Sequence, residues 1–299
     1  MKNFPPRRIL VPTDSCEPSL SALEAAKVLS NRFGARLELV YVQDLPLSLS
    51  GFDMEGSGLG TPGVLKQMAE FQSWRKERLA RAGAPFPASR LSVRTLQGSP
   101  VRELGRLAQP RRADLVVMGT HGYAGIGRAV FGSVAESVIR QAGVPVLVAH
   151  RSKQPFRIKK VLIPYNMEPY ADKALRYGLE FARGMGATAW VLFSALKGAD
   201  SEGYRRSLER HIGSRRLILR SGDPRHAILK EAARGGFDLI VLSAHRRPFL
   251  TGQVLGSTAE RILRHSNVPL LCVPSGAREP APAAADGGAW KELAWGKIF

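Results

Sequence analysis

The sequence has few cysteines and no long apolar segment. Its 299 residues include only Cys16 and Cys272, which excludes a disulfide framework and a CxxC metal pair. No uninterrupted apolar run approaches the roughly 20 residues that a membrane-spanning helix needs. The basic residues 1–8 are followed by no apolar segment of the kind that marks a secretory signal. We therefore expect a soluble, cytoplasmic protein.

The motifs of several common catalytic sites are also missing. The sequence contains no G-x4-G-K-[ST] loop and no G-x-S-x-G elbow, so it gives no support to a P-loop enzyme or a serine hydrolase. Its six histidines have no metal-ligand spacing, which argues against a zinc site. The sequence therefore assigns no catalytic residue and no metal ligand, and it leaves enzymatic activity open.

Acidic residues are in deficit. The chain has 44 Lys and Arg against 25 Asp and Glu, a net charge of +19. The excess is spread, because residues 1–151 carry 20 basic and 12 acidic residues and residues 152–299 carry 24 and 13. A basic balance attracts the phosphates of nucleotides, nucleic acids or anionic membranes. The sequence has no motif of a nucleic-acid-binding fold and no basic segment with interspersed aromatic residues. We therefore expect a solvated basic surface with no nucleic-acid or membrane partner.

Short apolar runs alternate with amphipathic segments in the first half of the chain. The runs predict strands at 8–12, 36–42, 91–96, 114–119 and 144–149. The amphipathic segments predict helices at 19–33, 64–82, 100–107 and 133–141. Residues 43–63 are rich in Gly, Ser, Pro and Asp and predict a long loop. Alternating strands and helices indicate βαβ units, and hence an α/β fold with a parallel sheet covered on both faces.

The pattern then repeats. Lys160–Asn166 matches the segment ending at Asp14 with an offset of 152 residues. Later landmarks recur with an offset of 124, as when Gly256-Ser257 matches Gly132-Ser133. The second copy is thus 28 residues shorter between its second and third strands, where the first copy has its long loop and charged helix. We expect two domains, residues 1–152 and 153–275.

Residues 276–299 differ in character from both copies. The stretch up to residue 289 is mainly Ala, Pro and Gly, which predicts a flexible tail. The final Trp290–Phe299 places its apolar residues near one helical face. We expect this end to fold back onto the protein, with a membrane surface or a partner as the alternative.

One glycine-rich stretch joins the fourth strand of the first copy to its last helix. Gly119-Thr120-His121-Gly122 is followed, after nine residues, by Gly132-Ser133-Val134. Glycines at such a junction let backbone N–H groups approach an anion, and the helix N-terminus adds positive dipole character. Ser133, as first residue or cap of the helix, adds a hydroxyl. The stretch predicts a phosphate cradle, although a tight turn that binds nothing would use the same glycines.

Several motifs and their duplication together resemble the universal stress protein family in its tandem two-domain form. They are Pro12-Thr13-Asp14, Gly98-Ser99-Pro100, Val144-Pro145-Val146 and the G-x2-G-x9-G-S pattern from Gly119 to Ser133. The likeness covers about residues 5–150 and 157–274. It implies two Rossmann-like domains, each a five-stranded parallel sheet in the order 3-2-1-4-5 flanked by helices, with the second truncated between strands 2 and 3. It also implies that the two fifth strands, 144–148 and 268–272, pair within the chain; a homodimer stays open.

The resemblance to ATP-binding members implies that the first domain binds ATP, with or without Mg²⁺. Asp14, with Thr13 beside it, would contact the adenosine, and the backbone at Val42 would meet the adenine edge. The residues expected at the ribose and phosphates are Met118, Gly119, His121, Gly122, Arg128, Gly132, Ser133 and Val134. Arg128 has the fork of donors that suits phosphate. Each polar residue could instead have a role that involves no ligand. Asp14 and Ser133 could be turn or helix caps, and His121 and Arg128 could be solvated loop residues.

The second domain departs from the pattern. Ser243 and Arg246 stand where Gly119 and Gly122 stand in the first domain, and Asn166 replaces Asp14. An arginine at a glycine position demands another loop geometry, so we expect weak or no nucleotide binding there. Arg246 and Arg247 filling the vacant pocket is the alternative. The implied function is an ATP-binding regulatory protein of the stress response; a nucleotide-independent scaffold or chaperone-like protein and a slow ATPase are the alternatives.

Overall fold

The computed structural model describes residues 4–14, 16–44, 86–119, 132–150, 154–195, 216–244 and 256–275, with a few residues inside 70–77 and 203–209. The expected tail, residues 276–299, lies outside the described residues, as does almost all of the loop at 43–63. Of the helix expected at 64–82, the structure describes Glu70, Ser73 and Glu77, which are helical and exposed. In the second half, Leu208 is helical and buried, so the shorter connection there keeps helical residues.

Ten strands form one continuous sheet in the order β3-β2-β1-β4-β5-β10-β9-β6-β7-β8. The strands of the first half are β1 (Arg8–Pro12), β2 (Arg36–Gln43), β3 (Leu91–Gln97), β4 (Leu115–Gly119) and β5 (Val146–Ala149). Those of the second half are β6 (Lys160–Pro164), β7 (Thr188–Ala195), β8 (Leu217–Ser221), β9 (Leu239–Ala244) and β10 (Leu270–Pro274). Neighbours are parallel within each half. The order 3-2-1-4-5 is therefore confirmed twice.

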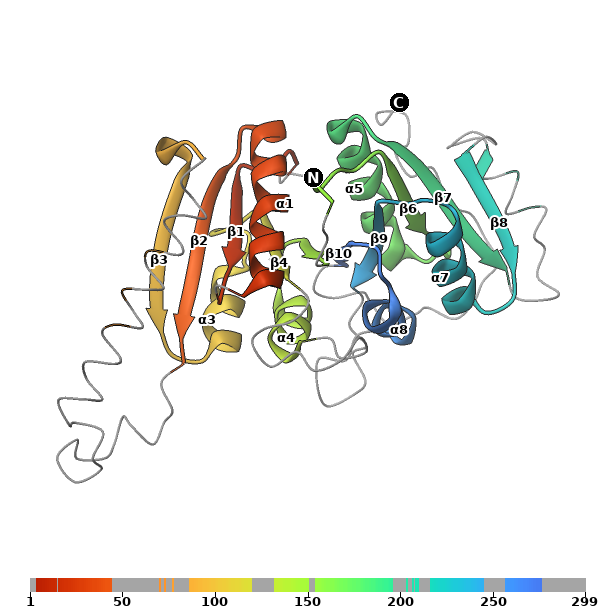
Figure 1. Ribbon diagram of the computed structural model, residues 1–299. Coiled ribbons are helices and arrows are strands. Elements are labelled where there is room, and N and C mark those ends of the chain that lie inside the picture. Colours follow the sequence, from red (N-terminus) through yellow and green to blue (C-terminus); the bar gives the residue numbers. More distant parts are fainter. Residues whose placement is uncertain are drawn as a thin grey trace, which may run out of the picture.

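The two halves join through their fifth strands. β10 pairs antiparallel with β5, so that Leu271 lies opposite Leu147. The expected pairing of the fifth strands is thus present, and it merges two five-stranded sheets into one (Figure 1). The β5 edge of one half and the β10 edge of the other are thus paired within the chain, and β3 and β8 are the outer strands of the sheet.

The helices fall into matching pairs. They are α1 (Glu17–Phe33), α3 (Pro100–Leu107), α4 (Ser133–Gln141), α5 (Pro169–Met185), α7 (Pro224–Arg234) and α8 (Ser257–His265), with a short 3-10 turn η2 (Ala88–Arg90). α1 and α5 both have a proline in their first turn and end at a left-handed glycine, Gly34 with φ 68° and Gly186 with φ 70°. Proline suits the first turn, where its missing N–H costs nothing, and glycine tolerates the left-handed cap.

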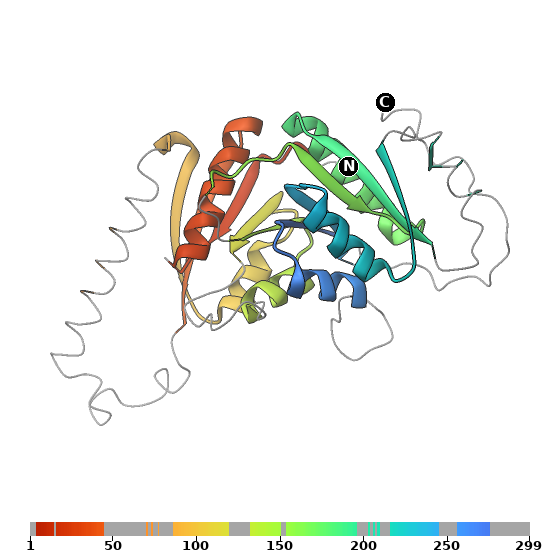
Figure 2. The ribbon, with the colours of Figure 1, turned by 45° about the vertical axis from the view of Figure 1, so that its right-hand side comes forward.

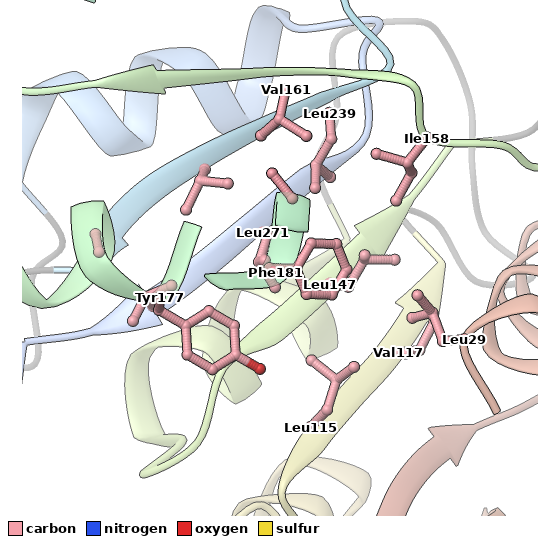
Figure 3. Close-up of a cluster of buried hydrophobic side chains, with 14 of the residues drawn as sticks. Leu29, Leu115, Val117, Leu147, Ile158, Val161, Tyr177, Phe181, Leu239 and Leu271 are labelled. Carbon is pink, nitrogen blue, oxygen red and sulfur yellow. The ribbon is translucent and has the colours of Figure 1, made fainter. Parts of the chain in front are cut away.

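Hydrophobic side chains fill both faces of the sheet. Alternate residues of each strand face opposite sides, so Ile9 and Val11 belong to the cluster under α1 and α5, whereas Leu10 belongs to the one under α3, α4, α7 and α8. Figure 2 shows the same two helical layers from another side. The first cluster is continuous across the junction: Leu147 of β5 and Leu271 of β10 meet beside Phe181 of α5 (Figure 3). The halves therefore share one core.

Two strands begin later than the sequence predicts. β4 starts at Leu115 and not at Asp114, because the Asp114 carboxylate accepts hydrogen bonds from the backbone N–H groups of Arg7 and Arg8 and so ends the turn before the strand. β5 starts at Val146 and not at Val144, since the intervening proline has no N–H to donate to the neighbouring strand.

Among the described residues, no helix is long and apolar enough to cross a membrane.

Candidate functional site

The candidate site lies at the C-terminal ends of β1 and β4. These strands are neighbours, with Ile9 opposite Leu115 and Leu10 opposite Val116. The chain leaves β1 toward β2 and leaves β4 toward β5, on opposite sides. In open α/β sheets such a switch point forms the crevice in which ligands bind. The topology thus brings the segments after Pro12 and after Gly119 to one place.

Asp14 organises the turn after β1. Its Oδ1 accepts a hydrogen bond from the Cys16 N–H at 3.0 Å, so the expected turn role is present. The Cys16 thiol also hydrogen-bonds to the Asp14 carboxylate, and the Asp14 side chain is half-buried. A carboxylate has about four acceptor sites, so Asp14 can accept further hydrogen bonds at the end of β1.

Thr13 is directed inward and away from the crevice. It is buried, its hydroxyl donates to Ser19 Oγ at 3.1 Å, and its N–H donates to the Val40 carbonyl at 2.9 Å. Ser19 in turn donates to the Cys16 carbonyl at 2.9 Å. Sequence reasoning missed Ser19, although a serine in a first helical turn commonly bonds to nearby backbone. Thr13 and Ser19 hold the turn in which Asp14 sits.

Gly119 is required by close packing inside the protein. A Cβ at this position would lie 2.6 Å from the Pro18 carbonyl oxygen and 2.7 Å from the Pro18 carbonyl carbon. The first turn of α1 therefore rests directly on the end of β4. This contact places the Asp14 turn over Gly119. It also means that packing alone requires a glycine here, whether or not a ligand binds.

Val42 presents its backbone to the crevice. Backbone groups alternate in direction along a strand, so residues two apart face the same neighbour. The Val40 carbonyl faces β1, because it accepts from Thr13, whereas the Gln43 carbonyl accepts from Gly98 on the β3 side at 2.9 Å. Val42 therefore faces the β1 side as well, but beyond Pro12, where β1 has ended. Its N–H and carbonyl therefore point into the space beyond the end of β1.

The start of α4 offers backbone donors. Gly132 is the N-cap and Ser133 the exposed first residue, and no side chain caps the helix. The first helical hydrogen bond runs from the Glu136 N–H to the Gly132 carbonyl, so the N–H groups of Ser133, Val134 and Ala135 have no helical acceptor. The alternative role of Ser133 as a cap is thereby excluded. Gly132 has φ −62° and ψ 133°, which any residue adopts.

The hydrophobic floor of the site comes from the strands. Met118 and Val42 are buried in the cluster on the α4 face, and Val134 packs against that cluster. Their side chains support the turn and helix around them.

His121, Gly122 and Arg128 lie outside the described residues, so their expected roles at the phosphates stay predictions. Within the described part of the chain, no group of His, Cys, Asp or Glu could hold a metal ion.

The matching place in the second half is built differently. Tyr165 stands where Thr13 stands, is buried, and donates its hydroxyl to Asp172 Oδ1 at 2.5 Å. Burial, and next the hydrogen bond to Asp172, raise the pKa of Tyr165 well above its usual value. A bulky phenol thus takes the place of the small Thr13–Ser19 pair.

The polar groups of the second half are occupied by the protein itself. Asn166 repeats the turn of Asp14, accepting from the Glu168 N–H at 3.3 Å, but its amide donates to the Tyr170 hydroxyl. Ser243, which replaces Gly119, donates to the Tyr170 carbonyl at 2.9 Å. Tyr170 is the counterpart of Pro18, so a hydroxyl bond replaces the direct contact seen at Gly119. Arg246 and Arg247 lie outside the described residues.

Cys16 borders the site without the features of a reactive thiol. It is the N-cap of α1 and lies two residues from Asp14. Burial, followed by the hydrogen bond to Asp14, raises its pKa above the usual value. A raised pKa lowers the fraction of thiolate, which is the nucleophilic form.

The geometry defines a class of protein: a tandem pair of Rossmann-like α/β domains joined edge to edge, each with a topological switch point between its first and fourth strands. The profile of the universal stress protein family matches residues 6–150 and 193–274. The chain belongs to the universal stress protein family. A universal stress protein from Methanocaldococcus jannaschii is 32% identical over 148 residues, covering 50% of this chain and 84% of that protein.

The solved structure of one relative agrees with the fold over nearly the whole chain. The crystal structure of a universal stress protein from Archaeoglobus fulgidus superposes with a TM-score of 0.69 at 22% identity, covering 91% of this chain and 100% of that one. A universal stress protein solved in complex with cAMP is 26% identical and covers 49% of this chain and 98% of that one, with a TM-score of 0.34.

Proposed function

We propose that this chain is a regulatory protein of the stress response that binds ATP in its first domain, residues 1–152. The observation that carries the proposal is the convergence of three sets of backbone or side-chain groups at the C-terminal ends of β2, β1 and β4. They are the Asp14 carboxylate, the backbone of Val42 beyond the end of β1, and the N–H groups at the start of α4.

Each set suits a different part of an adenine nucleotide. A carboxylate accepts hydrogen bonds from ribose hydroxyls, and a strand backbone offers the donor and acceptor that an adenine edge pairs with. A helix N-terminus with a serine at its first position suits phosphate, because the N–H groups and the dipole both favour negative charge. The order of these groups along the crevice follows the order of the nucleotide: base, sugar, phosphate.

The second domain, residues 153–275, is proposed to serve as a structural partner. Its N-cap Gly256 has φ −59° and ψ 142°, close to the values at Gly132, and a Cβ there would meet no atom within 4 Å. The helix start is thus retained, but Tyr165 and the amide of Asn166 are committed to Asp172 and Tyr170. A nucleotide would have to break those bonds before it could bind.

The test combines nucleotide content with titration. Purified protein is denatured, released nucleotide is identified by chromatography, and ATP, AMP and cAMP are then titrated into stripped protein. We expect one ATP per chain. Gly132→Val should abolish binding, because its side chain would occupy the position of the phosphate.

Gly256→Val is the matched control, since it makes the same change at the same cap position with nearly the same backbone angles. Any cost of placing valine at an N-cap is equal in the two variants, so only the loss of a site separates them. Binding that is halved by Gly256→Val would show two working sites. No released nucleotide and no titratable binding would favour the nucleotide-independent scaffold.

A further inference from the structure

Exposed cationic residues gather at the edge of the sheet opposite the candidate nucleotide site. In a parallel sheet, each helix returns the chain to the N-terminal end of the next strand. In the first half these returns carry Arg36, Arg111 and Arg112. In the second half Arg234 ends α7 before β9, and Arg157 and Lys159 lie in the segment that leads from β5 into β6. All six are exposed. We name these six residues the N-edge strip.

Both halves contribute to the same side of the molecule. Figure 1 shows β1, β2 and β3 in one half and β7 and β8 in the other running in the same downward direction, with α1 and α5 both ending at the top. Contacts bring these helix ends together: Arg32 Nε donates to the Gly184 carbonyl at 2.5 Å, and the Phe4 ring lies 5.5 Å from Phe33 and 6.4 Å from Phe181. The two groups of three cations therefore flank one junction.

The acidic residues at this edge do not neutralise the strip. Asp114 accepts from the N–H groups of Arg7 and Arg8, and Asp238 accepts from those of Lys159 and Lys160, so both carboxylates are directed inward at strand starts. None of the ion pairs formed among the described residues involves a side chain of the N-edge strip.

Helix dipoles explain only part of this arrangement. A cation in the last turn of a helix is stabilised by the negative end of the dipole, and Arg234 ends α7. The other five residues lie in loops or at strand starts, where no such stabilisation applies. A surface that keeps them together and unpaired fits an anionic partner.

The chemistry of the strip favours a polymer of phosphates. Five of the six residues are arginines, whose planar forks bind phosphate oxygens in pairs. A bilayer would call for an apolar anchor beside the cations, and the one large hydrophobic residue that is exposed in the described part of the chain is Val93, in the edge strand β3. We propose that the N-edge strip binds the phosphate backbone of nucleic acid without reading its sequence. This reverses the expectation drawn from the sequence.

The experiment measures fluorescence anisotropy of a labelled DNA duplex of about 20 base pairs between about 50 and 200 mM NaCl. If all six cations contact phosphates, the logarithm of the affinity should fall against the logarithm of salt with a slope near −5, since each contact contributes about −0.9. The strip variant combines Arg36→Gln, Arg111→Gln and Arg112→Gln. It should bind about 500-fold more weakly at 0.1 M salt, because each of the three lost contacts costs a factor of about eight there.

The control variant combines Arg102→Gln, Arg225→Gln and Arg261→Gln. It removes the same charge from exposed positions on α3, α7 and α8, away from the strip, and should keep its affinity within about threefold. Thermal melting verifies that both variants fold. Should the first strip variant unfold, Arg157→Gln, Lys159→Gln and Arg234→Gln together test the other half of the strip.

Three outcomes would overturn the proposal. The first is a wild-type protein that fails to bind the duplex in about 50 mM salt, and the second is a control variant that loses as much affinity as the strip variant. The third is co-sedimentation with phosphatidylserine vesicles that depends on the strip while duplex binding does not, which would assign the surface to membranes. Gly132→Val should bind the duplex as the wild type does, so this test stands apart from the nucleotide site.

Discussion

Gly119→Ala tests how the first turn of α1 is seated on the sheet. The added Cβ would lie 2.6 Å from the Pro18 carbonyl oxygen, whereas ordinary contact begins near 3.4 Å, so the two backbones must separate by about 0.8 Å. The two nearest atoms belong to the backbone and the third is the Pro18 Cβ at 3.0 Å, so a rotamer change cannot relieve the clash. Overpacking of this kind costs about 1–3 kcal/mol of unfolding free energy. At about 2–4 °C per kcal/mol, the melting temperature should fall by roughly 2–12 °C.

The measurement is urea unfolding and calorimetry of the variant beside Ser243→Ala. Ser243 occupies the same place in the second half and already carries a Cβ, so its truncation removes only the hydrogen bond to the Tyr170 carbonyl. That loss should cost about 0.5–1.5 kcal/mol. If Gly119→Ala is as stable as the wild type to within about 0.5 kcal/mol, the close contact with Pro18 does not constrain the site and the reasoning fails.

Two further predictions concern the crevice and the thiols. Asp14→Asn recreates the second-half residue and keeps the turn, as Asn166 shows; it should leave the melting temperature unchanged but weaken ATP binding about tenfold to a hundredfold, since a hydrogen bond to a charged group contributes about 1.5–3 kcal/mol. Wild-type affinity in isothermal titration of this variant would remove Asp14 from the site. Burial raises the pKa of Cys272 to about 12, so near pH 8 a thiol reagent should modify it only after unfolding. Cys16, whose pKa is also raised, should react more slowly than a free cysteine and faster as the pH rises; prompt native modification of both thiols would contradict this.

The sequence predicted the architecture well because hydrophobic periodicity and duplication carry most of it. The bounds of β1, α3 and α4 agree with the structure, and the offset of 152 residues reappears in the paired α1 and α5. Local patterns suffice there, since strand and helix faces are set by which side chains meet the core. The late start of β4 shows the limit, because a carboxylate that binds the backbone N–H groups of a distant segment leaves no signal in the neighbouring sequence.

The site and the charge distribution were harder to foresee. The sequence pointed to Gly119 for an approaching phosphate, and only the fold shows that Pro18 already fills that space. Similarly, Tyr165 and Asp172 are seven positions apart and their bond depends on how α5 begins. The six residues of the N-edge strip are spread along the sequence between positions 36 and 234, three in each half. Counting the charges of each half therefore does not reveal that these residues lie at one edge of the sheet. Contacts between distant segments decide these features, and a single sequence does not display them.

The antiparallel join of β5 and β10 has a consequence for how this protein is assembled in the cell. Ten residues connect β5 to β6, and a short tether gives the two halves an effective concentration in the millimolar range. A free single-domain relative present at micromolar levels would compete for the β5 edge at a disadvantage of roughly a thousandfold. The two unlike halves of this single chain thus pair as the subunits of a heterodimer would. Its ratio of unlike halves is fixed at synthesis, whatever the abundance of its relatives.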